Sequence, residues 1–316
     1  MEKKIPVTFE DLPGEFPRYG KLVRVVPGGT VLPHTYKKVA NAIYNFEYRK
    51  DDICLFTLPK SGTTWTAEIL WAMTHIDEMD RALTEKLNQR YFLIDNDFVN
   101  ELPMKDYMEK LKAKRPDAEE DRVMMQLADL EEGRRFIWSH LPFDLQNPDV
   151  LDKCKVVTVM RHPKDNMFSR YQHFKNYVDI SLEQIAMAYV TGNTIYGDYW
   201  HHIKEVWKRK GRPNLHTMFY EDMKADIMSE LRRLNEFLGT NLNEEQLKRV
   251  AEHTSFGNMK AQSTMVLDPT VPAGTFFFKG EVGSSKGQLS PDLDAEMDNW
   301  IKENALKVDP DFKYVK

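Results

Sequence analysis

The residues between positions 59 and 64 combine a positive charge, a glycine and several hydroxyl groups in one short loop. In order, they are Pro59, Lys60, Ser61, Gly62, Thr63 and Thr64. The loop follows an apolar run at 53–56 and precedes a helical pattern at 63–74, and a strand–loop–helix unit of this kind binds anions through backbone N–H groups and the helix N-terminus. Gly62 permits close approach of the backbone, and Lys60 adds a full charge. The alternative is an ordinary turn with one capping hydroxyl.

A second cation stands at the end of another apolar run. Arg161 directly follows the strand-like segment 155–160. A guanidinium binds phosphate through two parallel hydrogen bonds, and the carboxyl ends of buried strands face the ligand crevice of α/β sheets. A surface salt bridge with Asp165 is the alternative. The position favours an anionic ligand.

One histidine stands where a general base is useful. His140 follows the strand-like segment 135–139, and imidazole accepts protons near neutral pH. The chain has nine histidines, so the residue type alone decides little. A metal site is not predicted, because Cys54 and Cys154 lie far apart and His201 and His202 cannot share one helix face.

Six segments together resemble one known family. They are PKSGTTW (59–65), SHLP (139–142), RHPKDNMFSRYQHF (161–174), FYEDMK (219–224), HTSFGNMK (253–260) and KGEVG (279–283). In this order they are similar to the cytosolic sulfotransferases, which use 3′-phosphoadenosine 5′-phosphosulfate (PAPS) as donor and release adenosine 3′,5′-bisphosphate (PAP), with no metal. Residues 100–132 resemble the acceptor-side region of arthropod members, including the retinol dehydratase type.

The resemblance implies a role for each matching residue. His140 and Lys60 are expected to be catalytic, with His140 as the general base. Residues expected to bind the donor are Lys60, Ser61, Gly62, Thr63, Thr64, Trp65, Arg161, Ser169, Tyr220, Thr254, Phe256, Phe277, Lys279 and Gly280. Within that set, Arg161 and Ser169 hold the 3′-phosphate, and Trp65 and Phe256 sandwich the adenine. Without the resemblance, core packing is the commoner role of such aromatic residues.

Two departures from the family concern the chemistry. Trp138 stands where the family usually has a lysine, and Phe278 stands where it usually has an arginine. Each change removes a charge-assisted hydrogen bond, worth about 1.5–3 kcal/mol. They raise an alternative hypothesis: a sulfotransferase-like nucleotide-binding protein with weak or no turnover. A P-loop kinase is a third hypothesis, although the Gly-Lys-[ST] order is absent.

The partners expected are a hydroxylated small molecule and no nucleic acid, since the formal net charge is −5. An apolar alcohol or phenol is predicted as acceptor. Candidates for its pocket are Tyr91, Phe92, Phe98, Phe143, Phe276 and the segment 123–127. Ser290 and Pro291 replace the Thr-Val of the family's dimer motif, which leaves both monomer and dimer open.

The segments that position these residues predict an α/β fold with a central parallel sheet. Strands are expected at 21–26, 52–57, 135–139, 155–160 and 215–220. Helices are expected at 35–46, 63–74 and 162–174, and four more helical stretches follow residue 220, ending with 292–306. Strands that alternate with helices form parallel sheets covered on both faces.

The composition suits a globular protein of one domain. Of the 316 residues, 41% are hydrophobic, and no linker divides the chain. We expect a single domain at 1–316, with an N-terminal arm at 1–20 and a variable region at 100–132. The two cysteines predict buried thiols, and the lack of a leader-like or membrane-spanning segment predicts a cytoplasmic protein.

Overall fold

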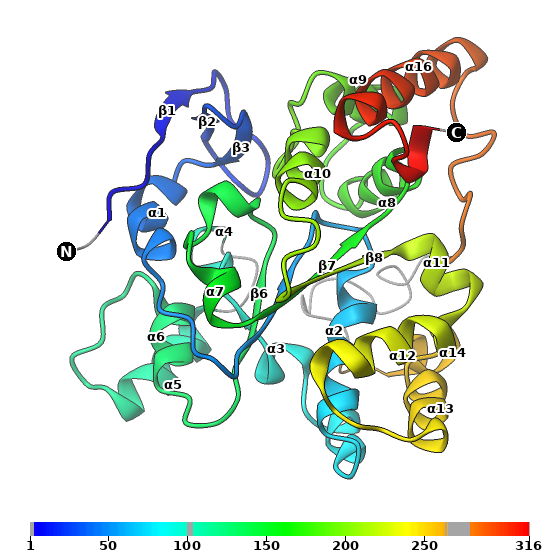
Figure 1. Ribbon diagram of the computed structural model, residues 1–316. Helices are drawn as coiled ribbons and strands as arrows, with labels where there is room; N and C mark the ends of the chain where they lie inside the picture. Colours follow the sequence, from blue (N-terminus) through cyan, green and yellow to red (C-terminus); the bar gives the residue numbers. More distant parts are fainter. Residues whose placement is uncertain (1–2, 100–103, 263, 265–278, 316) are drawn as a thin grey trace.

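A computed structural model describes residues 3–99, 104–262, 264 and 279–315, and its centre is a parallel β-sheet (Figure 1). Five strands pair in the order β5-β6-β4-β7-β8. Their bounds are β4 (Ile53–Phe56), β5 (Phe92–Leu93), β6 (Phe136–Ser139), β7 (Lys155–Met160) and β8 (Leu215–Phe219). The predicted fold class is therefore confirmed. The strand β5 was not predicted, because two residues carry no readable periodicity.

Both faces of this sheet are buried. Along β4, Cys54 and Phe56 pack in one hydrophobic cluster, whereas Ile53 and Leu55 pack in a second. Side chains alternate across a strand, so an unbroken apolar run requires cover on both faces. In Figure 1, β7 and β8 run between two groups of helices that supply this cover.

The helices fall on the two faces in a regular way. Those contributing to the first cluster include α1 (Tyr36–Tyr44), α8 (Pro163–Phe174), α9 (Leu182–Val190), α10 (Tyr199–Trp207) and α16 (Pro291–Val308). Those contributing to the second include α2 (Thr63–Thr74), α11 (Tyr220–Ala225), α12 (Ile227–Leu238) and α13 (Glu244–His253). Shorter or outlying helices are α3 (Leu87–Arg90), α4 (Asn96–Val99), α5 (Met104–Lys114), α6 (Val123–Asp129), α7 (Val150–Lys153) and α14 (Phe256–Ala261).

Local sequence explains several helix ends. Pro163 opens α8 at the first helical position, as predicted, because its missing N–H has no partner there anyway. Ser290 caps α16 by accepting a hydrogen bond from the Leu293 N–H at 3.4 Å, and Pro291 starts the helix. The Ser-Pro pair in place of Thr-Val is thus a helix start. From Tyr220 onward the described part of the chain has five α-helices rather than the four predicted, and the first of them, α11, directly follows β8.

A small antiparallel sheet precedes the central one. It consists of β1 (Thr8–Asp11), β2 (Leu22–Val26) and β3 (Thr30–Pro33), in that order. Only β2 was predicted from the sequence. Val23 and Val25 of β2 are fully buried and join the first hydrophobic cluster, so the N-terminal segment is anchored to the body of the protein.

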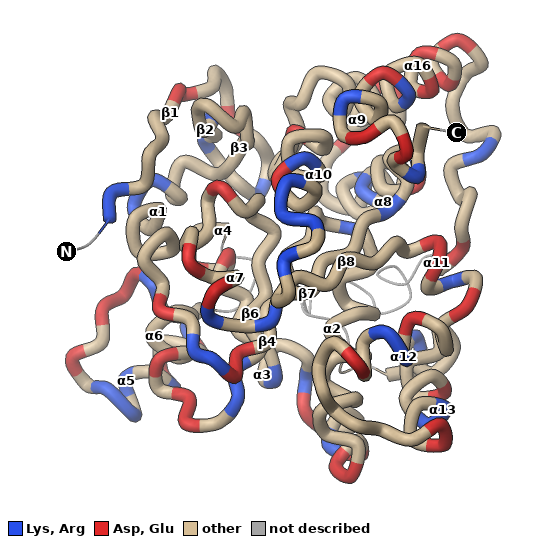
Figure 2. Tube along the Cα trace, viewed as in Figure 1, with Lys and Arg blue, Asp and Glu red and all other residues tan. Residues whose placement is uncertain are grey.

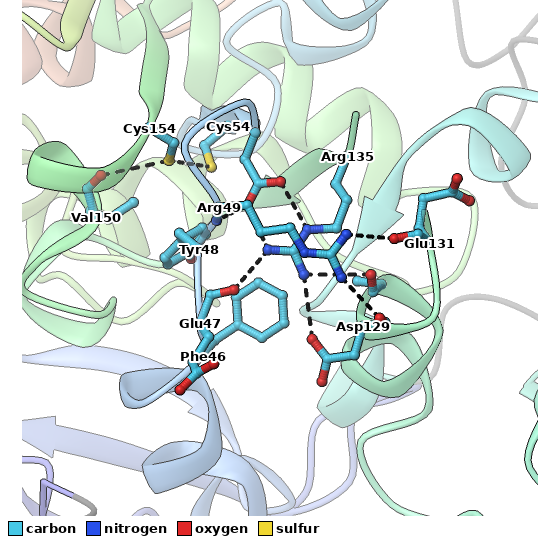
Figure 3. A network of polar contacts seen from close by, with 12 residues as sticks. Phe46, Glu47, Tyr48, Arg49, Cys54, Asp129, Glu131, Arg135, Val150 and Cys154 are labelled. Carbon is cyan, nitrogen blue, oxygen red and sulfur yellow. Dashed lines mark hydrogen bonds and ion pairs between the residues drawn. The ribbon is translucent and has the colours of Figure 1, made fainter. Parts of the chain in front are cut away.

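A buried ion pair joins the segments that lead into β4 and β6 (Figure 3). Arg135 donates from Nε and Nη2 to the two carboxylate oxygens of Asp52, at 2.8 and 2.6 Å. Both side chains are fully buried, and Nη2 also donates to the Glu47 carbonyl. Nearby, the Sγ atoms of Cys54 and Cys154 lie 3.5 Å apart as free thiols. The prediction of buried thiols is therefore confirmed.

Basic and acidic residues alternate along the chain rather than gathering in separate regions (Figure 2). Figure 2 shows basic and acidic segments interspersed around outer helices such as α5 and α12. Among the described residues, no helix is both long enough and apolar enough to cross a membrane.

Candidate active site

Most of the predicted site residues line one pocket at the carboxyl edge of the parallel sheet. They are Lys60, Gly62, Thr63, Thr64, Trp65, His140, Arg161, Ser169, Tyr220, Thr254, Phe256, Lys279 and Gly280. These residues follow β4, β6, β7 and β8 or come from later helices and loops. Parallel strands all end at the same edge, so the fold brings together segments that are far apart in the sequence.

Two predicted residues are not seen in the pocket wall. Ser61 is buried, and its Oγ accepts a hydrogen bond from Asn166 at 2.9 Å, so its side chain ties the loop to α8. Phe277 lies outside the described residues, as do Phe276 and Phe278.

The loop after β4 has the backbone shape that an anion cradle requires. Lys60 and Gly62 both have positive φ angles, of 69° and 111°. A Cβ atom at Gly62 would lie 2.8 Å from Cδ2 of Tyr220, so only glycine fits there. Gly62 is also the N-cap of α2, and no side chain caps this end. The alternative of a capping hydroxyl is therefore wrong, and the first N–H groups of α2 remain available to a ligand.

Arg161 connects this loop to the last one and keeps a free donor. Its Nη1 donates to the Lys60 carbonyl at 3.2 Å, and its Nη2 to the Glu281 carbonyl at 3.4 Å. Its Nε is buried and has no hydrogen-bond partner among the described residues. The predicted alternative, a salt bridge with Asp165, does not form.

Asp165 instead holds the last loop. Its carboxylate accepts hydrogen bonds from the Gly283 N–H at 2.6 Å, the Ser285 N–H at 3.0 Å and the Ser285 hydroxyl at 2.7 Å. The segment that carries Lys279 and Gly280 is thereby fastened to α8. A buried carboxylate that accepts three hydrogen bonds is a strong anchor.

Aromatic rings cover the side of the pocket that faces α2 and α14. The rings of Trp65 and Tyr220 meet edge to face with centroids 5.7 Å apart, and the Lys224 ammonium lies 5.6 Å from the Trp65 ring. Phe256 lies against Gly280, where an added Cβ would come within 2.3 Å of its ring. These rings offer flat surfaces for a base.

Tyr220 and Thr254 each lie at the end of a helix. Tyr220 was read as the end of a strand, yet it is the first residue of α11. Thr254 is the C-cap residue of α13, and its hydroxyl donates to the Val250 carbonyl at 2.8 Å. Both still line the pocket.

His140 is held in one orientation and in one protonation state. Its Nδ1 lies 2.7 Å from the Thr57 carbonyl oxygen, and its backbone N–H donates to Asp95 at 2.7 Å. A carbonyl only accepts, so Nδ1 carries the proton and the neutral ring leaves a lone pair on Nε2. Burial lowers the pKa of His140 to about 4, with the charges of Arg170 and Lys60 acting in the same direction. The ring is therefore an unprotonated base at neutral pH.

The predicted acceptor-pocket residues are mostly in the core. Tyr91, Phe98 and Phe143 are buried in the hydrophobic clusters, and Phe92 packs against one of them. The Met-rich segment 123–127 belongs largely to a small separate cluster, and none of the described residues in 104–132 lines the pocket.

Other residues supply the remaining wall. They are Tyr19, Leu93, Trp138, Phe168, Arg170, His173, Phe174, Ile195 and Tyr196. Trp138 is buried, and its ring meets that of His140 edge to face at 5.7 Å. Trp138 therefore lies beside His140 in the wall of this pocket.

Three residues at this site are absent from the set that the sequence predicted. Arg170 follows Ser169 on α8, Lys224 lies one turn after Tyr220, and Asp95 comes just after the unpredicted strand β5. The first two stand inside segments already singled out. Nothing in the sequence near Asp95 indicates that it bonds to the His140 backbone, because that contact spans separate strands.

No cluster of three or more histidine, cysteine, aspartate or glutamate side chains suited to a metal ion occurs within the residues that the structure describes.

A match to a family of known proteins agrees with this geometry. The sulfotransferase domain family matches residues 50–309, so the chain belongs to that family. It is thus a PAPS-dependent sulfotransferase by class. The kinase hypothesis is set aside by this membership.

Individual relatives extend over most of the chain. Luciferin sulfotransferase of Photinus pyralis is 30% identical over 292 residues, covering 87% of this chain and 77% of the relative. Sulfotransferase 1E1 of Bos taurus is 29% identical, covering 86% of this chain and 92% of the relative. The crystal structure of retinol dehydratase with retinol and PAP superposes with a TM-score of 0.81 at 25% identity, covering 96% of this chain and 92% of that one.

Proposed function

We propose that this enzyme transfers the sulfuryl group of PAPS to the hydroxyl of a small, largely apolar alcohol or phenol, with His140 as the general base. The observation that carries the proposal is the Nδ1–Thr57 hydrogen bond of 2.7 Å, which leaves Nε2 unprotonated in the pocket that Lys60 also lines. A base and an anion cradle in one pocket suit transfer of an anionic group to a hydroxyl.

The pocket fits the donor at each of its chemical parts. The loop at 60–65 and the uncapped N-terminus of α2 suit the 5′-phosphosulfate, and the unpartnered Nε of Arg161 suits the 3′-phosphate. Trp65 and Phe256 offer ring faces to the adenine. Ser169, which lines the same pocket from α8, offers a hydroxyl to the 3′-phosphate as well. PAPS, when bound, supplies an already activated sulfuryl group.

The chain's own residues then have separate tasks. His140 takes the proton of the acceptor hydroxyl at Nε2, while the Thr57 carbonyl keeps Nδ1–H in place. Lys60 places a positive charge where negative charge develops on the leaving phosphate, which is electrostatic stabilisation by a preorganised group. Asp95 fixes the backbone of His140, so the base does not have to be ordered during the reaction.

The names of the relatives support the acceptor class. One relative acts on luciferin, and solved structures of retinol dehydratase hold retinol or androsterone together with PAP. The pocket wall around His140 is rich in aromatic and aliphatic side chains, including Trp138, Phe174 and Ile195. Such a wall suits a small molecule with a large apolar part.

Trp138 supports a second candidate function. It places an uncharged ring beside His140 where the family usually has a lysine, which favours a nucleotide-binding protein with weak turnover. The two candidates make different predictions about catalysis and the same prediction about nucleotide binding.

One experiment tests both. PAP binding is measured by calorimetry without Mg²⁺, and transfer is measured with labelled PAPS and a panel of phenols, sterols and terpenoid alcohols. Binding together with transfer supports the enzyme. Binding without transfer to any acceptor supports the second candidate, and failure to bind PAP contradicts both.

A further inference from the structure

Arg170 is a buried cation with no matching anion in the part of the chain that the structure describes. It lies on α8, its side chain is almost fully buried, and Nη2 donates to the Ile195 carbonyl. Nε and Nη1 have no hydrogen-bond partner among the described residues, and no carboxylate there forms an ion pair with this side chain. Its other neighbours are Phe174 and Tyr189, whose ring centroids lie 5.6 and 5.8 Å from Cζ, and the Tyr189 hydroxyl also interacts with the guanidinium.

A buried guanidinium without an anionic partner is unfavourable unless a ligand supplies the anion. An ionised side chain in an apolar wall loses its hydration, and only pairing with an opposite charge offsets that loss. Two other buried arginines show the contrast: Arg135 is paired with Asp52 and Arg90 with Glu68. Arg161 is buried without a carboxylate partner among the described residues, as Arg170 is, and it too lines the pocket. Arg170 also lines the active-site pocket, so the missing anion can arrive with a ligand.

Its position assigns Arg170 to the acceptor side of the pocket. Ile195, whose carbonyl Arg170 binds, precedes Tyr196, and the Tyr196 ring lies 5.4 Å from that of His140. The donor side has cations of its own on other loops, Lys60 and Arg161. The charge of Arg170 also lowers the pKa of His140, which agrees with a location near the base.

We propose that Arg170 binds an acidic group on the acceptor, so that the preferred acceptors carry a carboxylate in addition to the hydroxyl that is sulfated. This inference rests on the proposed function and narrows its substrate class. The guanidinium suits a carboxylate because it offers several N–H donors in one plane. The aromatic wall binds the apolar body between the two polar ends, and His140 receives the hydroxyl.

The test compares acids with their uncharged esters. A series of ω-(4-hydroxyphenyl)alkanoic acids of increasing chain length is assayed beside the matching methyl esters, with labelled PAPS. Wild type should prefer one of the acids to its ester. Arg170→Met should lower kcat/KM for that acid by about tenfold to a hundredfold and leave the ester within about twofold, since one charged hydrogen bond is lost.

Two further variants control for charge and for structure. Lys175→Met removes an exposed charge just after the same helix and should leave kcat/KM unchanged for both the acid and the ester. Arg170→Lys keeps the charge without the planar donors and should recover part of the preference for the acid. Melting of Arg170→Met should be unchanged or higher, because the variant removes an unpaired buried charge.

Several outcomes would overturn the inference. Equal losses for acid and ester in Arg170→Met would place Arg170 on the transferring group or in the fold. A wild type that prefers every ester to its acid would also contradict the inference. If no acceptor is sulfated at all, the proposed function fails, and calorimetry of the acids against the PAP-loaded protein still decides the role of Arg170. Tighter binding of an acid to wild type than to Arg170→Met supports it, and equal binding contradicts it.

Discussion

The two ends of the active-site pocket are built in different ways. At the end proposed to bind the donor, here called the donor end, the groups come from loops that follow strands, such as Lys60 and Gly62 after β4 and Arg161 after β7. At the acceptor end, the wall combines side chains from the N-terminal arm, α8 and the segment around Tyr196. One end uses backbone shape and fixed charges, and the other uses packed side chains.

This difference explains what each end can tolerate. A backbone cradle depends on a few positions such as Gly62, where any side chain would collide with Tyr220. An aromatic wall accepts substitution more readily, because volume and polarity matter more than one exact backbone angle. We therefore expect changes at the donor end to alter nucleotide affinity, and changes near His140 to alter the chemical step or the choice of acceptor.

The largest effect is expected at the boundary between the two ends. His140→Ala should lower turnover by about 10²–10⁴-fold, the usual cost of losing a general base. PAP affinity should stay close to that of wild type, because the ring faces the acceptor. Turnover with a good acceptor and calorimetry with PAP check this. A variant that transfers as fast as wild type would show that His140 is structural.

A smaller effect is expected for the cation of the donor end. Arg161→Ala should weaken PAP by about tenfold to a hundredfold, since one charge-assisted hydrogen bond is lost. Adenosine 5′-monophosphate, which has no 3′-phosphate, serves as the control ligand and should change little. Equal losses for the two nucleotides would mean that Arg161 only connects the Lys60 and Glu281 carbonyls.

A change behind the last loop should act through that loop. Asp165→Ala removes the acceptor of the Gly283 and Ser285 hydrogen bonds, so Lys279 should be held less well. We expect PAP affinity to fall by about tenfold or less, as when a hydrogen bond worth about 1 kcal/mol is lost. The KM for acceptor should not change. Asp152→Ala, an exposed carboxylate paired with Arg212, is the control, and an equal loss there would contradict this role.

The smallest effect near neutral pH concerns protonation of the base. Because the pKa of His140 is lowered to about 4, the acid limb of kcat/KM should fall near pH 4 rather than near the ordinary histidine value of about 6.5. The unfolded chain binds a proton first as pH falls, so this group's contribution to stability should be complete above about pH 6.5 and decline toward pH 4. A pH–rate profile and melting curves measure both. A limb near pH 6.5 would mean that the base is exposed to solvent.

Much of the donor end was predictable because its residues are neighbours in the sequence. The loop at 59–65 contains its own glycine, lysine and hydroxyls. Pro163, which starts the next helix, lies two residues after Arg161. Backbone angles and helix ends depend mainly on nearby residues. The sequence alone therefore determined that a loop with a lysine, a glycine and several hydroxyls joins β4 to α2, and that a second cation follows β7.

Only the tertiary structure decided the rest. The direction of Ser61 into the protein, the support of His140 by Thr57 and Asp95, and the unpaired charge of Arg170 all depend on contacts between distant segments. The sequence likewise did not decide whether each aromatic side chain lines the pocket or packs in the core, and Tyr91 packs in the core. The physical reason is that a buried side chain's role is set by what packs against it, and packing partners are not adjacent in the chain.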